Sequence, residues 1–167
     1  MDVLRSERIA RVGDRDPIEV LRATPLRVEA AVLDPRFRAD QATRDGGRTA
    51  RALIARATDR EVAFAYRARQ TVAATHRPEI GPYRTRPVDE DRWASDEGRM
   101  DPALAAAAFA ALRAWNLAWL ARRDLADWLA TYQPGDGTGE VSLDELVRAV
   151  AGHDLELLEE LGALGGA

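Results

Sequence analysis

Helix-start signals open three segments of the chain in which apolar residues recur at helical spacing. Asp16-Pro17 and Asp101-Pro102 each place a capping carboxylate before a proline, which the first turn of a helix tolerates. Ser142 and Glu145 have the spacing of a capping box. A fourth segment, at about 49–75, also carries its apolar residues on one face. Amphipathic helices bury such faces against one another, so the sequence predicts an all-α four-helix bundle.

The four helices are expected at about 16–33, 49–75, 101–123 and 143–161. Pro25 lies inside the first helix and should kink it near Thr24, because proline removes a backbone donor and crowds the preceding turn. Residues 77–100 are rich in proline and glycine, which predicts a long crossover between the second and third helices. Residues 1–15 are expected to form an N-terminal extension, and residues 16–167 a single domain.

The composition excludes several kinds of chemistry. The chain has no cysteine, which excludes thiol catalysis by the protein, a cysteine zinc site and disulfides. All 24 basic residues are arginine, so neither Schiff-base lysine chemistry nor a P-loop lysine is available. The formal net charge of -4 argues against broad binding to nucleic acid. The longest apolar stretch, 103–112, is too short to cross a bilayer, and we expect a cytoplasmic protein that binds neither membranes nor nucleic acid.

Histidines and one carboxylate are the first candidates for a site. The two histidines, His76 and His153, are too few for a three-histidine zinc site unless carboxylates complete it. His76 is expected to be exposed at the end of the second helix. His153 flanks the apolar stripe of the fourth helix, and Asp154 falls inside that stripe. A buried carboxylate needs a partner, so Asp154 should accept hydrogen bonds or pair with an arginine, in a structural rather than a catalytic role.

Aromatic and basic residues mark two further helix faces. Phe109, Leu112, Trp115 and Trp119 are spaced three or four apart on the third helix, which favours the core or the lining of a pocket. The second helix carries a stripe of arginines, which are Arg56, Arg60 and Arg67. Such a stripe is typical of a solvated face, but its nearness to apolar residues also allows a guanidinium in a pocket, where carboxylates from another helix would have to pair with it.

Five segments together resemble the DinB-like family of bacterial four-helix-bundle proteins, from about residue 16 to residue 161. They are DPIEVLRATP, RTARALIARATDREVAFAYR, PEIGPYRTRPVDEDRW, FAALRAWNLAWL and GEVSLDELVRAVAGHD. The resemblance implies a bundle in which one histidine of the second helix and two of the fourth bind a divalent metal such as zinc or nickel. It also implies that some members are thiol-dependent transferases and related enzymes.

The histidine triad of this family is incomplete in the chain. Arg56 stands at the position of the histidine on the second helix, His153 matches the first histidine of the fourth helix, and Leu157 replaces the other. Arg67 matches an arginine near the end of the family's second helix. Arginine stays protonated and cannot give a lone pair to a metal. We therefore hypothesise that the guanidinium of Arg56 occupies the metal position.

In this hypothesis Arg56 stacks near His153 and is held by a carboxylate of the fourth helix: Asp154, Glu156 or Glu160. The function expected from it is that of a non-catalytic protein, which binds a small molecule between its helices or acts as a homodimeric scaffold. No catalytic residue and no cofactor is assigned.

Two alternatives remain. One is a transferase or hydrolase of the family that depends on a divalent metal or on a thiol cosubstrate, and that uses His153 with Glu156 or Glu160. The other is an interaction protein that binds a partner helix through the tryptophans of the third helix.

Overall fold

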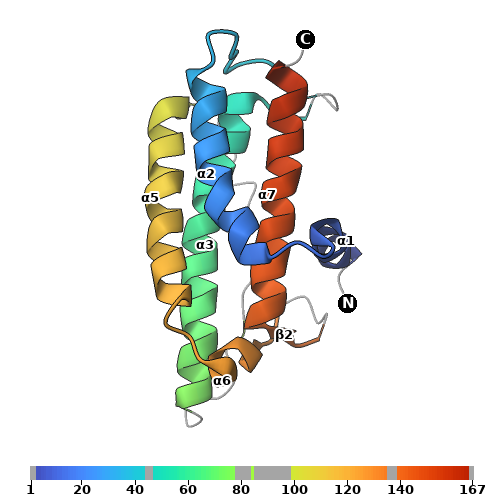
Figure 1. The fold of residues 1–167 in the computed structure, drawn as a ribbon, viewed down its shortest axis with the longest axis vertical. Coiled ribbons are helices and arrows are strands. Elements are labelled where there is room, and N and C mark those ends of the chain that lie inside the picture. Colours follow the sequence, from blue (N-terminus) through green and yellow to red (C-terminus); the bar gives the residue numbers. More distant parts are fainter. Residues whose placement is uncertain (1–2, 44–46, 78–83, 85–98, 135–138, 166–167) are drawn as a thin grey trace.

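The computed structural model describes residues 3–43, 47–77, 84, 99–134 and 139–165. Four long helices run along the length of the molecule and form a four-helix bundle, as predicted (Figure 1). They are α2 (Pro17–Leu33), α3 (Ala50–His76), α5 (Pro102–Leu120) and α7 (Leu143–Gly165). A shorter helix, α1 (Val3–Val12), lies outside this bundle against α7. The short α6 (Leu125–Leu129) and two strands complete the described elements.

Caps set where the long helices begin. Asp16 accepts a hydrogen bond from the backbone N–H of Ile18 at 2.8 Å, and Asp101 caps α5 in the same way. The predicted capping box is confirmed, because the Glu145 carboxylate accepts from the Ser142 N–H at 2.8 Å and the Ser142 hydroxyl accepts from the Glu145 N–H at 3.1 Å. Side chains next to the sequence breaks thus determine the starts of three helices.

Two differences from the expected elements have local causes. Helix α5 ends at Leu120 rather than near residue 123, because the backbone turns there and Asp124 caps α6. The segment between α6 and α7, for which no regular element was expected, contains a small sheet. It contains the antiparallel strands β1 (Thr131–Tyr132) and β2 (Val141–Ser142), whose buried Tyr132 and Val141 close one end of the core. The crossover expected at 77–100 lies mostly outside the described residues.

The four long helices form a ring in the order α2, α5, α3, α7, in which each contacts its two neighbours. Helices α2 and α3, although consecutive, therefore lie on one diagonal of the bundle, and α5 and α7 lie on the other. An up-and-down bundle with short loops would instead place consecutive helices side by side. The long segment at 34–49 between α2 and α3 provides the length for this diagonal step.

The core consists of two apolar clusters. One lies toward β1 and β2 and includes Leu21, Phe64, Leu120 and Val147. The other lies toward the opposite end and includes Val28, Ile54, Phe109 and Leu157. Between the two clusters, each long helix contributes at least one buried polar residue: Thr24, Glu61, Arg113, Asn116 and Asp154. A polar layer therefore crosses the middle of the bundle.

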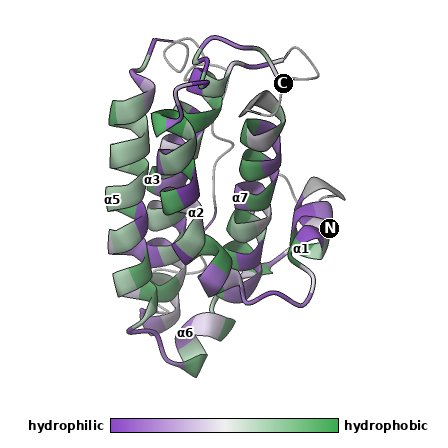
Figure 2. Cartoon of the chain, turned by 45° about the horizontal axis from the view of Figure 1, so that its top comes forward, coloured by the Kyte–Doolittle hydropathy of each residue, from purple (hydrophilic) through white to green (hydrophobic). Residues whose placement is uncertain are grey.

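Helix α5 is the most apolar element, and Figure 2 shows it as hydrophobic along almost its whole length. Among the described residues it alone is long and apolar enough to cross a membrane by length and composition. Its contacts with α2 and α3 and its buried Arg113 and Asn116 make it a core helix of this bundle. The predicted burial of Phe109 is confirmed, but that of Trp115 is wrong, because its side chain is 56% exposed and lies under the guanidinium of Arg69.

Helix α1 packs on α7 at a glycine. A Cβ atom at Gly152 would lie 2.2 Å from the carbonyl oxygen of Arg8 and 2.6 Å from its carbonyl carbon. The close approach is supported by an ion pair between Arg11 and Glu159 at 2.5 Å. Only glycine leaves room for the backbone of α1 at this point, so Gly152 determines how tightly α1 is held.

Replacing Gly152 by alanine should weaken the packing of α1, because the new methyl group collides with the backbone of Arg8. We expect a loss of about 1–3 kcal/mol in the free energy of unfolding, which is the usual cost of overpacking. Urea denaturation measures this loss, and limited proteolysis measures the release of residues 3–12.

Gly162→Ala is the matched control in the same helix, since a Cβ there meets nothing within 4 Å. It should stabilise the protein by about 0.5–1 kcal/mol through helix propensity alone. Equal stabilisation by both substitutions would contradict the described packing of α1.

Candidate functional site

The guanidinium of Arg113 lies at the centre of the polar layer and contacts all four long helices. Its side chain, on α5, is only 2% exposed. Nη1 donates to the carbonyl of Leu21 on α2 at 2.8 Å and to Asp154 Oδ2 on α7 at 2.6 Å. Nη2 donates to Glu61 Oε1 on α3 at 2.8 Å and to Asp154 Oδ1 at 3.0 Å. The bidentate pair with Asp154 spans the diagonal between α5 and α7.

Pro25 explains why the Leu21 carbonyl is available to Arg113. In a regular helix this oxygen would accept from the N–H of the residue four positions later, which is Pro25 and has no N–H. Helix α2 continues through Pro25 to Leu33, and the side chain of Arg113 supplies the missing donor. The proline predicted to disturb α2 is therefore part of the buried site.

Asn116 extends the network toward the surface. Its Nδ2 donates to Glu61 Oε2 at 3.0 Å and to the Glu61 carbonyl at 3.2 Å, while its Oδ1 accepts from Arg69 Nη1 at 3.1 Å. The Arg69 guanidinium lies 3.8 Å from the ring centroid of Trp115 and 4.9 Å from that of Trp119. Both oxygens of Glu61 are thus satisfied, and the network ends in a cation–π stack on the outside of α3 and α5.

The charges of this layer are strongly coupled. Burial raises the pKa of Asp154, and the guanidinium of Arg113 opposes that rise. Desolvation disfavours the charge on Arg113, but the attraction of Asp154 and Glu61 outweighs it and raises the pKa of Arg113. Arg113 therefore remains a cation whose charge requires both carboxylates.

His153 belongs to a second, more peripheral group on α7. Its side chain is 21% exposed, and Nδ1 lies 3.5 Å from Glu156 Oε2 without forming a hydrogen bond. Glu156 Oε2 also lies 3.6 Å from Arg8 Nε on α1. Burial lowers the pKa of His153 to about 4, with Glu156 opposing the shift and the charges of Arg60 and Arg8 adding to it. The interaction with His153 lowers the pKa of Glu156 to about 2.

The structure corrects the Arg56 hypothesis for two of the carboxylates that it named. The expectation that Asp154 is buried and pairs with an arginine is confirmed, but the arginine is Arg113 and not Arg56. Glu156 is also not held by Arg56, since its partners are His153 and Arg8.

The remaining predicted residues differ in burial from Arg113 and Asp154 or lie in the apolar core. The α3 arginines Arg56 and Arg67 are half-buried, as is Glu160 on α7, whereas Leu157 is buried in the apolar cluster toward the far end of the bundle. The charge of Arg56 acts on the neighbouring Asp59, and the α3 charge that acts on His153 is that of Arg60, one turn further along. His76 is exposed as predicted, and its Nε2 lies 2.6 Å from Asp127 Oδ1.

Sequence reasoning missed Arg113, Asn116 and Glu61. A signal was available, because Phe109, Arg113, Asn116 and Leu120 recur at intervals of three and four and share one face of α5. Two polar residues on an apolar face indicate a buried network as clearly as Asp154 does. The prediction was instead based on the tryptophans, of which Trp115 is exposed and Trp119 is half-buried.

The ring of four helices, with its diagonal step from α2 to α3, defines this protein as a four-helix-bundle protein of unusual connection order. The chain belongs to the DinB superfamily, whose family model matches residues 18–160. Helix α1 precedes that match. No curated protein matches the sequence.

A solved structure with a similar fold is that of YfiT from Bacillus subtilis, described as a probable metal-dependent hydrolase with an unusual four-helix bundle topology. It is 21% identical in sequence, and the match covers 89% of this chain and 83% of that one with a TM-score of 0.78. At this identity the likeness establishes the shared fold.

The residues around His153 do not fit a divalent metal. The imidazole lies near the carboxylate of Glu156, and the described residues contain no group of three histidine, cysteine, aspartate or glutamate side chains that could hold a metal ion. Arg8 and Arg60 place positive charge on the same group. A stable site needs three or four ligands and no adjacent cation, so the donor set is too small and the local charge has the wrong sign.

Arg113→Leu should lower the free energy of unfolding by about 3–5 kcal/mol, because it leaves two buried carboxylates without their cation. Urea denaturation at pH 7 measures this loss. Arg148→Leu is the matched control, since the Arg148–Asp144 pair is partly exposed on the surface of α7 and should contribute no more than about 1 kcal/mol. Equal losses in the two variants would contradict a central role of Arg113.

The defect of Arg113→Leu should also depend on pH. Arg113 opposes the rise of the Asp154 pKa, so that pKa rises further when the arginine is absent. A raised carboxyl pKa favours the folded state below it, and this advantage disappears as the pH rises through it. Denaturation at pH 5, 7 and 8 should therefore show the difference from the unsubstituted protein growing with pH.

His153 should stay neutral in the folded protein until the pH falls toward about 4. The unfolded chain takes up this proton near pH 6.5, so the stability that the neutral imidazole contributes is present above that pH and lost as the pH falls from 6.5 toward 4. An NMR titration of the imidazole protons measures the pKa directly. Glu156→Gln should lower it further, because Glu156 favours the protonated form; a rise would contradict the described contact.

Proposed function

We propose that this chain is a metal-independent, non-catalytic member of the DinB superfamily whose bundle binds a small molecule. The observation that carries the proposal is the surroundings of His153. Where the family resemblance implies two further histidines, the charges that act on this imidazole are those of Arg8, Arg60 and Glu156. A guanidinium cannot serve as a metal ligand and repels a divalent cation.

The N-terminal helix strengthens the argument. Arg8 comes from α1, which lies before the part of the chain that matches the family model, and α1 packs on α7 beside His153. One of the two cations near the imidazole is therefore supplied by an element outside the family's own bundle. In this proposal, arginines of both α1 and α3 oppose metal binding at His153, so the site differs from a metal site at more than one position.

The buried network gives the bundle cohesion that needs no metal. A metal held by histidines of two helices would link those helices, and here Arg113 links four of them through hydrogen bonds to Leu21, Glu61 and Asp154. Its ligands are a carbonyl and two carboxylates, all within 3.0 Å. We therefore expect folding and stability to be independent of divalent ions.

Elemental analysis of the purified protein, combined with melting curves with and without zinc, nickel and a chelator, tests the proposal. Metal that binds only the folded state would raise the melting temperature. We expect less than stoichiometric metal and a melting temperature that changes by no more than about 1 °C, which corresponds to well under 1 kcal/mol for a chain of this size.

His153→Ala and His76→Ala form a matched pair of variants for this experiment, since they remove the two histidines of the chain separately. Stoichiometric metal that is lost in His153→Ala but kept in His76→Ala would overturn the proposal in favour of a metal-dependent enzyme. A metal-dependent hydrolysis or thiol-transfer activity that disappears in His153→Ala would overturn it as well.

A further inference from the structure

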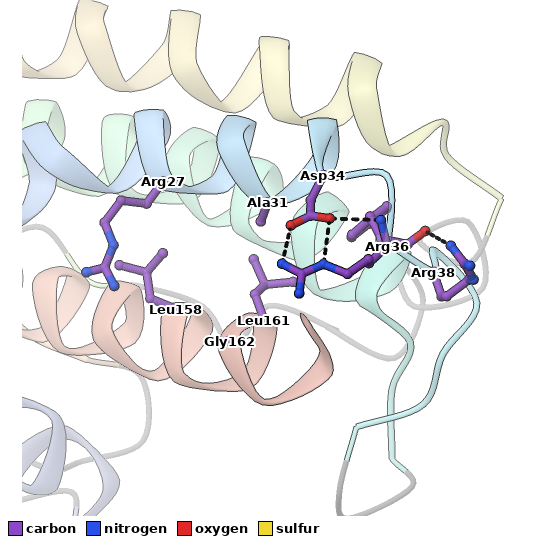
Figure 3. A pocket seen from close by; sticks show the side chains of 9 residues that line it. Arg27, Ala31, Asp34, Arg36, Arg38, Leu158, Leu161 and Gly162 are labelled. Carbon is purple, nitrogen blue, oxygen red and sulfur yellow. Dashed lines mark hydrogen bonds and ion pairs between the residues drawn. The ribbon is translucent and has the colours of Figure 1, made fainter. Parts of the chain in front are cut away.

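A cavity lies between α2, α7 and the segment that follows α2, away from the polar layer (Figure 3). Its volume is about 210 Å³, and it is lined by Arg27, Ala31, Asp34, Arg36, Phe37, Arg38, Leu158, Leu161 and Gly162. Pockets for drug-sized ligands measure roughly 300–1,000 Å³, so an occupant of this cavity must be short. The lining combines an apolar floor with arginines at its edge.

The floor is formed mainly by leucines of α7. Leu161 belongs to the apolar cluster toward this end of the bundle, and the partly buried Leu158 and Phe37 pack against that cluster. Gly162 of α7 also lines the cavity; it is exposed, and a Cβ atom there would meet nothing within 4 Å. This surface can hold a short aliphatic chain and offers it no hydrogen-bonding partner along the leucines.

At the edge of the cavity, Asp34 and Arg36 form an ion pair in which their charges cancel. Asp34 binds Arg36 in a bidentate pair, with Nε–Oδ1 at 3.1 Å and Nη2–Oδ2 at 2.9 Å, and also accepts from the Arg36 backbone N–H at 2.8 Å. These contacts lower the pKa of Asp34 to about 2. Asp34 therefore stays ionised and paired with Arg36. Its negative charge does not balance the positive charges of the other two arginines of the lining.

Among the described residues that line the cavity, Arg27 and Arg38 carry positive charge that no carboxylate of the lining balances. Arg38 donates to the carbonyls of Pro35 and Phe37, and it forms no ion pair with the residues that the structure describes. Arg27 likewise has no ion pair within the described part of the chain, and in Figure 3 its side chain extends from α2 toward Leu158 on α7. A guanidinium that ends beside an apolar floor is arranged to bind the charged head of an amphiphile.

We infer that this cavity binds a short aliphatic monocarboxylate, with the carboxylate on Arg27 and the chain on Leu158 and Leu161. The inference rests on the proposed function of a small-molecule-binding protein and specifies its ligand. The head forms charge-assisted hydrogen bonds with Arg27, and the tail leaves water for the floor between α2 and α7. Arg38 adds attraction for an anion from the other side of the Asp34–Arg36 pair.

Isothermal titration calorimetry with octanoate, 1-octanol and acetate tests the inference on the full chain. Octanoate should bind at one site per chain, and both octanol and acetate should bind at least tenfold more weakly, because one lacks the charge and the other the tail. Arg27→Gln should weaken octanoate binding at least tenfold. Arg22→Gln is the matched control on the same helix; Arg22 pairs with Glu19 outside the cavity, and its loss should change the affinity less than twofold.

Gly162→Phe should abolish octanoate binding by filling the cavity from a position with open space around it. Leu158→Gln, which makes the floor polar, tests the same surface if the phenylalanine variant does not fold by circular dichroism. The inference is overturned by the absence of octanoate binding, by octanol binding as tightly as octanoate, by unchanged affinity in Arg27→Gln, or by unchanged affinity in a folded floor variant.

The metal content of the same preparations separates this result from the proposed function. Octanoate binding in a protein with stoichiometric metal on His153 would keep the ligand site and overturn the metal-independent role. A metal-free protein without octanoate binding would overturn the ligand site and leave that role in place.

Discussion

The arrangement of the helices depends on the hydrogen bonds and ion pairs of the buried Arg113 guanidinium. It extends from α5 across the bundle axis to Asp154 on the diagonal helix α7, and it contacts Leu21 and Glu61 on the two neighbouring helices. Contacts between apolar side chains have no preferred direction. The planar guanidinium of arginine, by contrast, donates its hydrogen bonds in fixed directions, so its partners must lie at particular positions. The network therefore specifies the register of four helices whose apolar faces alone would permit several.

The same hydrogen bonds explain the proline within α2 and the polar residues within the apolar helix α5. Pro25 leaves a carbonyl of α2 without its helical donor, and Arg113 supplies that donor. Asn116 satisfies the second oxygen of Glu61 and continues to Arg69, whose guanidinium covers Trp115. A helix as apolar as α5 thus carries two buried polar residues without leaving the carboxylate of Glu61 unsatisfied, because every helix around it contributes a partner.

The fold of the superfamily is retained in this chain, and the surroundings of His153 differ from the histidine triad that the family resemblance implies. The superfamily match covers the bundle, yet the charges around this imidazole come from Arg60 on α3 and from Arg8 on α1, a helix that precedes the match. Because Gly152 lets the backbone of α1 approach α7 closely, Arg8 is brought next to Glu156. Two arginines from different helices thus act on the imidazole, together with one carboxylate.

The sequence by itself determined the helices and the need of Asp154 for a polar or charged partner. Capping residues and proline and glycine breaks are local signals, and they placed the starts of α2, α3, α5 and α7 within a residue or two. A carboxylate on an apolar stripe likewise needs a partner in any fold. Only the tertiary structure decided that the partner is Arg113 rather than Arg56, since all 24 basic residues are arginine and carry the same charge and reach. The arginine that meets Asp154 depends on which helices lie on the diagonals of the bundle. That arrangement results from packing between segments far apart in the chain, so it cannot be predicted from the spacing of residues within one helix.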